Sequence, residues 1–583
     1  MLVPFRSILV PAVLALPPGV GQDPALEAPV APETPESPAP AVQEPAPSGY
    51  LAPDEVLEHL RSLREQGRMD WIRLAVTAEA RELGVAAFGE RALPGRPAIL
   101  VVADPAGDRP AATAVALALC EALAEGGSPL LERATVYVAP LANPDAAARA
   151  FAGLAPRRGA AVDEDRDGLL DEDGPDDLDG DDLLLQMRVP DPTGDWRAAE
   201  ADARALVRAQ RDKGEAGAYR LLPEGRDDDR DRAYNEDDLG GADWDGNWPH
   251  RYRAHVPASG PYPLSEAETR ALAEFVLGHP HLALVIVLGA EDNLSKPPEA
   301  GDDRSAKATK PLAEDAKLLA LWSERWLKDA KNKPRSGERG AGGFAEWAYF
   351  QAGLPVVQSA VWSPPLDASA SAGKDGEKEG DATEDGAGKK NDGAGKKDDK
   401  DVPDEVKLLR WNDQALGGAG FVPWRKFQHP DLGEVEIGGW KPLALHNPPA
   451  GELPALAEQW RARLESLAED LPRLSWAKVE VRELGDGVLE ARATLVNSGL
   501  LASMSEMGSV TNRPRPLRVL LELPEGGALL AGERIQSVER LGGSGGNREY
   551  RWLYALKPGS APAQLRALSD TAGEALVVLE VNR

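Results

Sequence analysis

The sequence predicts an α/β domain, in which helices flank a mixed sheet, followed by a C-terminal β-sandwich domain. Residues 99–103 are a short apolar run, which is typical of a strand buried on both faces. Pro, Gly and Asp give 104–110 turn chemistry, and the Ala- and Leu-rich stretch 111–123 predicts a buried helix ended by two glycines. From Leu474 the pattern changes to short alternating strands joined by Gly and Pro turns, which predicts the sandwich.

The strand, the tight loop and the helix form the first half of a βαβ unit. In open α/β sheets ligands lie at the carboxyl ends of strands, so any chemistry is expected in 104–110. Before this unit, Val56, Leu60 and Leu63 recur at helical spacing, and Asp54 stands where a cap is expected. The first domain is therefore expected to contain helices at 54–66, 265–277, 312–331, from 344 and at 453–467, and strands at 72–76, 85–88, 134–140, 281–288 and 354–362.

Composition limits the kind of partner this chain can have. Its 96 acidic residues outnumber its 66 basic residues and give a formal net charge of −30, which argues against binding nucleic acid or an anionic membrane. Its single cysteine, Cys120, cannot form an intramolecular disulfide, and we expect a buried apolar side chain there. The sequence leaves the oligomeric state open.

The first residues resemble a secretory signal, because Arg6 precedes an apolar run and small residues follow it. We therefore expect a secreted or periplasmic protein with no transmembrane segment after cleavage. The expected organisation is a signal peptide at 1–21, a disordered Pro-, Ala- and Glu-rich linker at 22–49, the α/β domain at 50–468 with an acidic insertion at 161–183 and a disordered insertion at 366–404, and the sandwich at 469–583.

The acidic insertion has the spacing of a calcium-binding loop. Four ligand positions of such a loop and its glycine, Gly168, are matched, although Gly174 stands where a bidentate Glu is usual. Carboxylates this close repel one another unless a cation neutralises them. One interpretation is therefore that the insertion binds calcium, and the other is that it is a solvated acidic insertion. The predicted calcium ligands are Asp163, Asp165, Asp167, Asp171 and Asp173, with Asp177, Asp179 and Asp181 as substitutes.

Several short motifs occur in the order found in one enzyme family. A strand, His-Gly-Asn/Asp-Glu-Pro and an Ala-rich helix form the first metal motif of the zinc carboxypeptidases, and this chain has Ala-Gly-Asp-Arg-Pro at 106–110. Asn143-Pro-Asp, Asp243 with Asn247 and Pro249, and Leu354-Pro follow in the family's order. Residues 50–450 therefore resemble a zinc carboxypeptidase, which implies the carboxypeptidase fold, a zinc ion and removal of C-terminal residues from peptides.

The functional positions of the family are occupied by other residue types. The family's first His falls on Ala106, its Glu ligand on Arg109, its carboxylate-binding Arg on Gly246 next to Asp245, its third ligand on Leu288 or Gly289, and its general base on Ala360. The methyl group of Ala106 has no lone pair for zinc, and the guanidinium of Arg109 is a permanent cation that repels it. We therefore expect no bound zinc, although the family implies it.

Several other side chains each allow two interpretations. His250 and His255 either reach the cleft or are surface or structural histidines. An oxygen-rich site for calcium or magnesium, or simple turn capping, would explain Asp104, Asp108, Glu291 and Asp292. Stacking faces for a ligand, or core packing, would explain Trp244, Trp248 and Tyr252.

The sequence thus favours an exported, non-catalytic carboxypeptidase homologue that binds a peptide or a glycan. The alternative is an active metallocarboxypeptidase that removes C-terminal residues with rearranged zinc ligands. A third hypothesis is a hydrolase of another type that uses the acidic cleft residues.

Overall fold

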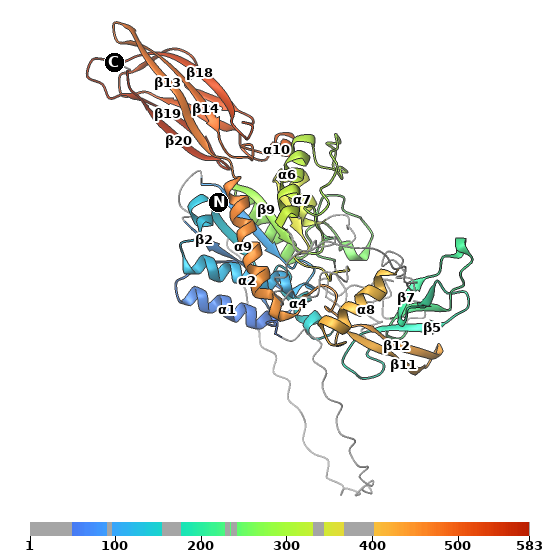
Figure 1. Ribbon diagram of the computed structural model, residues 1–583. Coiled ribbons are helices and arrows are strands. Elements are labelled where there is room, and N and C mark those ends of the chain that lie inside the picture. The colour runs from blue at the N-terminus through green and yellow to red at the C-terminus, as the bar shows by residue number, and fades with distance from the viewer. Residues whose placement is uncertain are drawn as a thin grey trace, which may run out of the picture. The chain divides into compact units, whose positions relative to one another are not determined.

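The central sheet is built around two wholly buried strands, β3 and β9, which pair in parallel. This computed structural model describes residues 49–89, 96–153, 176–227, 234, 242–329, 343–366 and 402–581. In this sheet, which contains the labelled strands β2 and β9 of Figure 1, β4, β3, β9 and β10 pair in parallel, whereas β2 pairs antiparallel with β1 and β4, which confirms the predicted mixed sheet. The strand order is β1 (Asp70–Val76), β2 (Glu82–Phe88), β4 (Thr135–Ala139), β3 (Ala98–Ala103), β9 (Leu282–Leu288), β10 (Val356–Ser359).

Helices cover both faces of this sheet, which is why its strands are apolar on both sides. In β3, Ile99 and Val101 pack on one face and Leu100 and Val102 on the other, as the two-residue period of a strand requires. The first face is covered by α1 (Pro53–Glu65), α2 (Pro110–Glu125), α6 (Ala313–Asp329) and α9 (Leu453–Glu469), and the second by α5 (Ala267–Gly278) and α7 (Phe344–Phe350). The short helices α3 (Pro129–Arg133) and α4 (Pro144–Phe151) flank β4 in the chain.

The predicted elements lie within a few residues of these bounds, but two helix starts were wrong. The first helix begins after Ala52, whose N–H donates to Glu55 Oε2 at 2.7 Å, and Asp54 lies inside the first turn. Pro53 fits the first helical position, so the cap falls one residue before it. The α5 helix begins at Ala267, two residues after the expected Ser265, because the Ser265 hydroxyl accepts a hydrogen bond from Asn247.

A second sheet, which sequence reasoning missed, joins two distant segments of the chain. All of its paired strands are antiparallel, and β5 pairs with β12 across more than 240 residues of sequence. Its order is β11 (Phe421–His429), β12 (Gly433–Trp440), β5 (Gln186–Pro190), β8 (Tyr219–Pro223), β6 (Trp196–Ala199), β7 (Asp202–Arg208). Helix α8 (Asp404–Ala415) packs on it through Leu409, and Phe421 joins the same small core.

The C-terminal sandwich is confirmed and has its own core. Alternate residues of its strands point inward, and Trp552 and Tyr554 are completely buried there. One sheet contains β13 (Leu474–Gly485), β14 (Val488–Asn497), β18 (Gly546–Ala555) and β16 (Ala528–Ala531). The other contains β17 (Ile535–Val538), β15 (Leu517–Glu522), β19 (Ala563–Ser569) and β20 (Gly573–Leu579), and α10 (Glu506–Thr511) lies between β14 and β15 in the chain.

Several predictions concern residues outside the described parts. These are the signal peptide, the linker up to residue 48, the calcium ligands between 163 and 173, and the insertion at 367–401. Among the residues that the structure describes, no helix combines the length and the apolar character needed to span a bilayer.

Candidate functional site

The loop at the carboxyl end of β3 is a tight turn that folds back on its own first residue. The Arg109 N–H donates to Asp104 Oδ1 at 2.9 Å, and the Gly107 N–H donates to the Asp104 carbonyl at 3.3 Å. Both Asp104 and Gly107 have left-handed φ values, 52° and 78°. A Cβ on Gly107 would lie 2.5 Å from the Ala146 Cβ, so only glycine fits this close approach to α4.

Asp104 is the most buried ionisable group of this loop. Its side chain is 1% exposed, and this burial, together with the Asp108 charge, raises the pKa of its carboxyl to about 7. Hydrogen bonds from the backbone N–H groups of Arg109 and Gly107 partly offset this rise, because they lower the pKa of Asp104. Asp104 is therefore a structural acceptor for the turn and is poorly placed for a ligand from outside.

Arg109 fills the family's Glu-ligand position with a buried cation. The residue is 7% exposed, and the Asp108 carboxylate lies 3.5 Å away, between Nε and Oδ1. Both atoms are buried, and neither has a hydrogen-bond partner in the part of the chain that the structure describes. Ala106 offers only a methyl group. This donor set does not fit zinc, because it lacks the imidazole and carboxylate ligands and places a positive charge where the metal would be.

Residues from far along the chain cover this loop. The Asn447 side chain accepts the Ala111 N–H at 2.9 Å and donates to the carbonyls of Asp108 and Leu443 at 3.3 and 2.9 Å. Burial, and then the Arg109 charge, lower the pKa of neighbouring His446. Sequence reasoning missed both residues, because nothing in the local pattern at 443–447 points to a partner more than 300 residues away.

The turn after β9 contains the other expected acids, but they do not converge on a metal. Asp292 is buried and accepts hydrogen bonds from the Leu294 N–H and the Ser359 hydroxyl, both at 2.9 Å, so it caps a turn. Glu291 accepts the Gln358 Nε2–H at 3.0 Å instead. Among the described residues, neither acid joins Asp104 and Asp108 in a metal-sized group, so the structure supports turn capping, the other interpretation of these acids.

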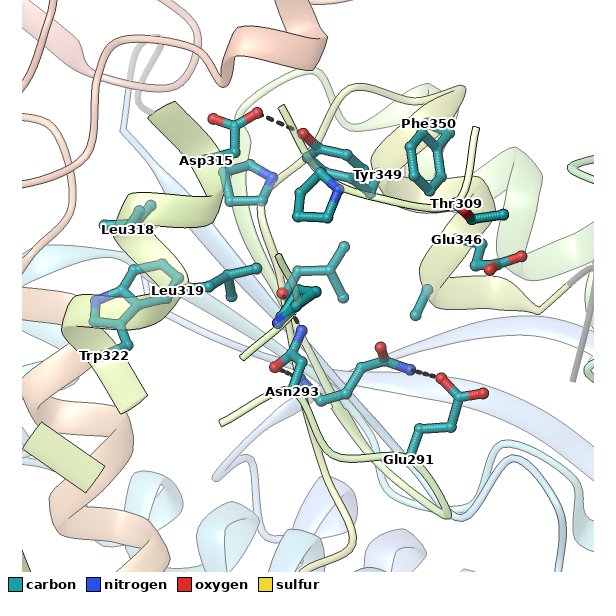
Figure 2. Close-up of a pocket in the computed structure, with 16 residues that line it drawn as sticks. Glu291, Asn293, Thr309, Asp315, Leu318, Leu319, Trp322, Glu346, Tyr349 and Phe350 are labelled. Carbon is teal, nitrogen blue, oxygen red and sulfur yellow. Dashed lines mark hydrogen bonds between the residues drawn. The ribbon is translucent and has the colours of Figure 1, made fainter. Parts of the chain in front are cut away.

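A cavity opens beside this turn, and it contains about 660 Å³ of empty space when the open solvent at its mouth is included (Figure 2). Leu318, Leu319 and Trp322 of α6 form one apolar wall, and Tyr349 and Phe350 of α7 line the other side. Its lining in the described residues includes carboxylates but no Lys, Arg or His. These carboxylates are Glu291, Asp315 and Glu346.

More acidic groups lie close to the cavity lining. Glu346 forms an ion pair with Arg251, with 3.0 Å between Nε and Oε2. Burial, and then the charges of Asp243 and Glu291, raise the pKa of Asp245 to about 7. Asp245 also accepts the Phe344 N–H at 3.2 Å. In these described contacts, acidic groups outnumber the one basic side chain, Arg251, which pairs with Glu346.

The carboxylate-binding fork of the family is absent from this region. A Cβ on Gly246 would lie 2.6 Å from the Ala258 carbonyl oxygen, so the backbone fills the space that a side chain would need. Asp245, which occupies the family's Asn position, is an acid. At the general-base position, Ala360 is 2% exposed and offers no proton acceptor on its side chain.

Three of the histidine and aromatic candidates, His250, Trp244 and Trp248, are buried in the core. His250 is completely buried, its Nε2 lies 2.8 Å from the Ala308 carbonyl, and its ring stacks on Phe350, whereas His255 is exposed. Trp244 and Trp248 pack together in the core, so neither offers a stacking face to a ligand. The Tyr252 hydroxyl donates to the Gly260 carbonyl.

One carboxylate cluster lies beside the acidic insertion. One oxygen from each of Asp177, Asp179 and Glu224 lies within 4.8 Å of the others. Glu224 is completely buried, accepts the N–H groups of Leu178 and Leu185 at 3.0 Å, and has a pKa raised to about 7, chiefly by burial. The calcium ligands predicted between 163 and 173 lie outside the described residues, so calcium stays a prediction.

Comparisons with known proteins bear on the first and last domains. A family model for zinc carboxypeptidases matches residues 56–361, just over half of the chain, and a model for a domain of unknown function matches residues 473–580. A search of curated proteins found no match.

Solved structures give weak matches. Bovine thrombin-activatable fibrinolysis inhibitor in complex with tick carboxypeptidase inhibitor is 14% identical over 53% of this chain and 86% of that one, with a TM-score of 0.31. Carboxypeptidase A from Helicoverpa armigera is 13% identical over 53% of this chain and 64% of that one, with a TM-score of 0.33. A further structure of thrombin-activatable fibrinolysis inhibitor, 13% identical with a TM-score of 0.31, is matched over 65% of its length, just under two thirds. On the family match over residues 56–361, this chain belongs to the zinc carboxypeptidase family.

Proposed function

We propose that this protein is an exported, non-catalytic zinc-carboxypeptidase homologue that binds a peptide by recognising a positively charged side chain of that peptide. The observation that carries the proposal is the cavity beside β9 and β10, whose described lining combines apolar walls with carboxylates and no basic side chain. The lack of catalytic groups supports the same proposal, since Ala106, Arg109 and Ala360 offer neither zinc ligands nor a general base.

The chemistry of the lining favours a peptide over a glycan. A lysine or arginine stem would pack on Leu318, Leu319 and Trp322, and its charged end would meet Glu291. Glycan binding was predicted from exposed stacking faces, but Trp244 and Trp248 are buried in the core. The peptide reading is therefore the one that the described side chains support.

The ligand should not need a free C-terminal carboxylate. The family's Arg and Asn are replaced by Gly246 and Asp245, and the remaining local charge is acidic. A terminal carboxylate placed there would be repelled rather than held. An internal or amidated basic segment should bind at least as well as one that ends at the basic residue.

Isothermal titration calorimetry with acetyl-Ala-Ala-Lys-amide tests the proposal, and acetyl-Ala-Ala-norleucine-amide serves as the uncharged isostere. The lysine peptide should bind about tenfold more tightly than the norleucine peptide. This factor corresponds to roughly 1.4 kcal/mol of binding free energy from charge pairing. Glu291→Gln should remove this preference. Glu274→Gln, which changes an exposed acid on α5, should retain it. Equal affinities of the two peptides for the wild-type protein would contradict the proposal.

The same protein should release no C-terminal residue from a peptide with a free carboxylate. Hydrolysis that stops on chelation and returns with zinc would favour the alternative, an active metallocarboxypeptidase with rearranged ligands. Hydrolysis that survives zinc chelation and needs calcium or magnesium would favour the third hypothesis.

A further inference from the structure

The loop at the family's metal position is covered by a segment from beyond the family match. The match ends at residue 361, whereas His446 and Asn447 lie in the turn 443–447. We infer that this chain has converted the metal position into a metal-independent joint, in which Arg109 supplies the positive charge and the turn 443–447 closes the loop. The inference concerns how the loop is held together and does not depend on peptide binding.

The charge balance of the loop supports this inference. The buried guanidinium of Arg109 lies 3.5 Å from the Asp108 carboxylate, and its charge opposes the rise in the pKa of the buried Asp104 carboxyl. Buried carboxylates need a cation or several hydrogen-bond donors, and here a residue of the loop itself supplies the cation. A divalent metal would have to enter beside this fixed positive charge, at a position that offers a methyl group instead of an imidazole.

The hydrogen bonds of the turn 443–447 complete the joint. The Ala111 N–H belongs to the first turn of α2, where backbone donors have no partner within the helix, and Asn447 Oδ1 accepts it. The same side chain donates to the Asp108 carbonyl in the loop and to the Leu443 carbonyl in its own turn. One asparagine thus joins the helix, the loop and the turn.

The joint fixes the start of the segment that leads into α9. This helix begins at Leu453, soon after the turn, and its Trp460 and Leu464 are buried in the same core as Val115 and Leu119 of α2. The hydrogen bond from Ala111 to Asn447 at the start of α2, and the apolar packing along this helix, therefore hold α2 and α9 together. In this role the loop stabilises the fold and takes no part in chemistry.

The full-length protein tests the inference by thermal unfolding and by hydrogen exchange. The melting temperature of the wild-type protein should stay within about 1 °C when EDTA or zinc is added, because the loop contains its own cation. Asn447→Ala should speed exchange of the amides at 111–113 about tenfold, as expected for the loss of a buried hydrogen bond. Stoichiometric zinc in the purified protein, with a melting temperature that falls on chelation, would overturn the inference.

A charge-matched pair of variants separates the role of Arg109 from a general effect of charge. Arg109→Gln should lower the melting temperature by about 3 °C or more, and Arg270→Gln, at an exposed position on α5, should leave it unchanged. If Arg109→Gln does not fold, Asn447→Ala and the chelation experiment still decide the question. Failure of the lysine peptide to bind would leave these results unaffected, so the two proposals can fail separately.

Discussion

At the scale of single residues, the loop at 104–110 has a defined shape without metal-ligand side chains. Gly107 and Asp104 have the left-handed backbone that turns the chain sharply after β3. The neighbouring side chains, Ala106 and Arg109, no longer offer ligands to a metal. The shape depends on backbone conformation and close packing, which the loop needs whether or not a metal binds.

The first prediction concerns Gly107. Gly107→Ala should lower the free energy of unfolding by about 2 kcal/mol or more, because its φ is 78° and the new Cβ would meet Ala146 at 2.5 Å. Urea unfolding followed by circular dichroism measures the change. Gly278→Ala is the matched control, since no atom lies within 4 Å of its Cβ position, and it should change stability by less than about 0.5 kcal/mol.

The second prediction concerns Glu224 and pH. Its pKa is raised from 4.5 to about 7, so the folded state binds more protons than the unfolded state between these values. Stability contributed by the protonated group is therefore lost as the pH rises from about 4.5 to above 7. Glu224→Gln stays neutral, so the loss of stability in this variant should be smaller than in the wild-type protein, by up to about 3 kcal/mol.

Chemical unfolding at pH 5 and pH 8, in the presence of EDTA, measures this difference. Glu483→Gln, at an exposed position of β13, should follow the wild-type curve. If calcium binds beside the acidic insertion, as the sequence predicts, millimolar calcium should reduce the loss at pH 8. A Glu224→Gln protein with the same pH dependence as the wild type would refute the prediction.

At the scale of elements, the short helix α10 of the sandwich region is hydrogen-bonded to a residue that lines the cavity. The Asp315 carboxylate accepts the Tyr349 hydroxyl at 2.8 Å and the N–H groups of Glu506 and Met507 at 2.9 and 3.1 Å (Figure 2 shows the first of these). Because Asp315 and Tyr349 also line the cavity, α10 and the cavity share the same buried group.

The third prediction follows from this shared group. Asp315→Ala leaves several buried donors without an acceptor, so the free energy of unfolding should fall by about 3 kcal/mol, and the amides at 506–508 should exchange faster. Hydrogen exchange with mass spectrometry measures the second effect. Glu324→Gln, at an exposed position on the same helix, should change neither quantity, and unchanged exchange in Asp315→Ala would contradict the prediction.

At the scale of the whole molecule, the formal charge of −30 opposes the compact state. Like charges at the surface repel one another over a distance that salt shortens, from about 30 Å at 10 mM to about 10 Å at 100 mM. The charge also disfavours nucleic acid and anionic membranes as partners, and it agrees with a cationic peptide as the proposed ligand.

The fourth prediction is that salt stabilises this protein. Raising sodium chloride from 10 to 100 mM should increase the melting temperature in scanning calorimetry, because repulsion between the excess acidic residues is screened. Choline chloride should act in the same way, since screening does not depend on the identity of the cation. A melting temperature that falls with both salts would show that attractive ion pairs dominate instead.

Local patterns in the sequence were enough to predict the central elements. The buried run in β3 and β9, the turn chemistry of 104–110 and the alternation after Leu474 each depend on neighbours a few residues away. The motif order at Gly107, Asn143 and Asn247 was enough to identify the zinc carboxypeptidase family, which the match over residues 56–361 confirms. By contrast, β5 to β8 were missed because their pairing with β12 gives no local signal.

By itself, the sequence determined the family and the α/β and sandwich architecture, because residue type and short-range spacing fix these properties. Only the tertiary structure decided which groups meet. It placed Asn447 on α2, buried Trp248 instead of exposing it, and gathered Glu291, Asp315 and Glu346 around one cavity. Contacts between residues hundreds of positions apart depend on how helices and sheets pack, and a linear pattern does not contain that information.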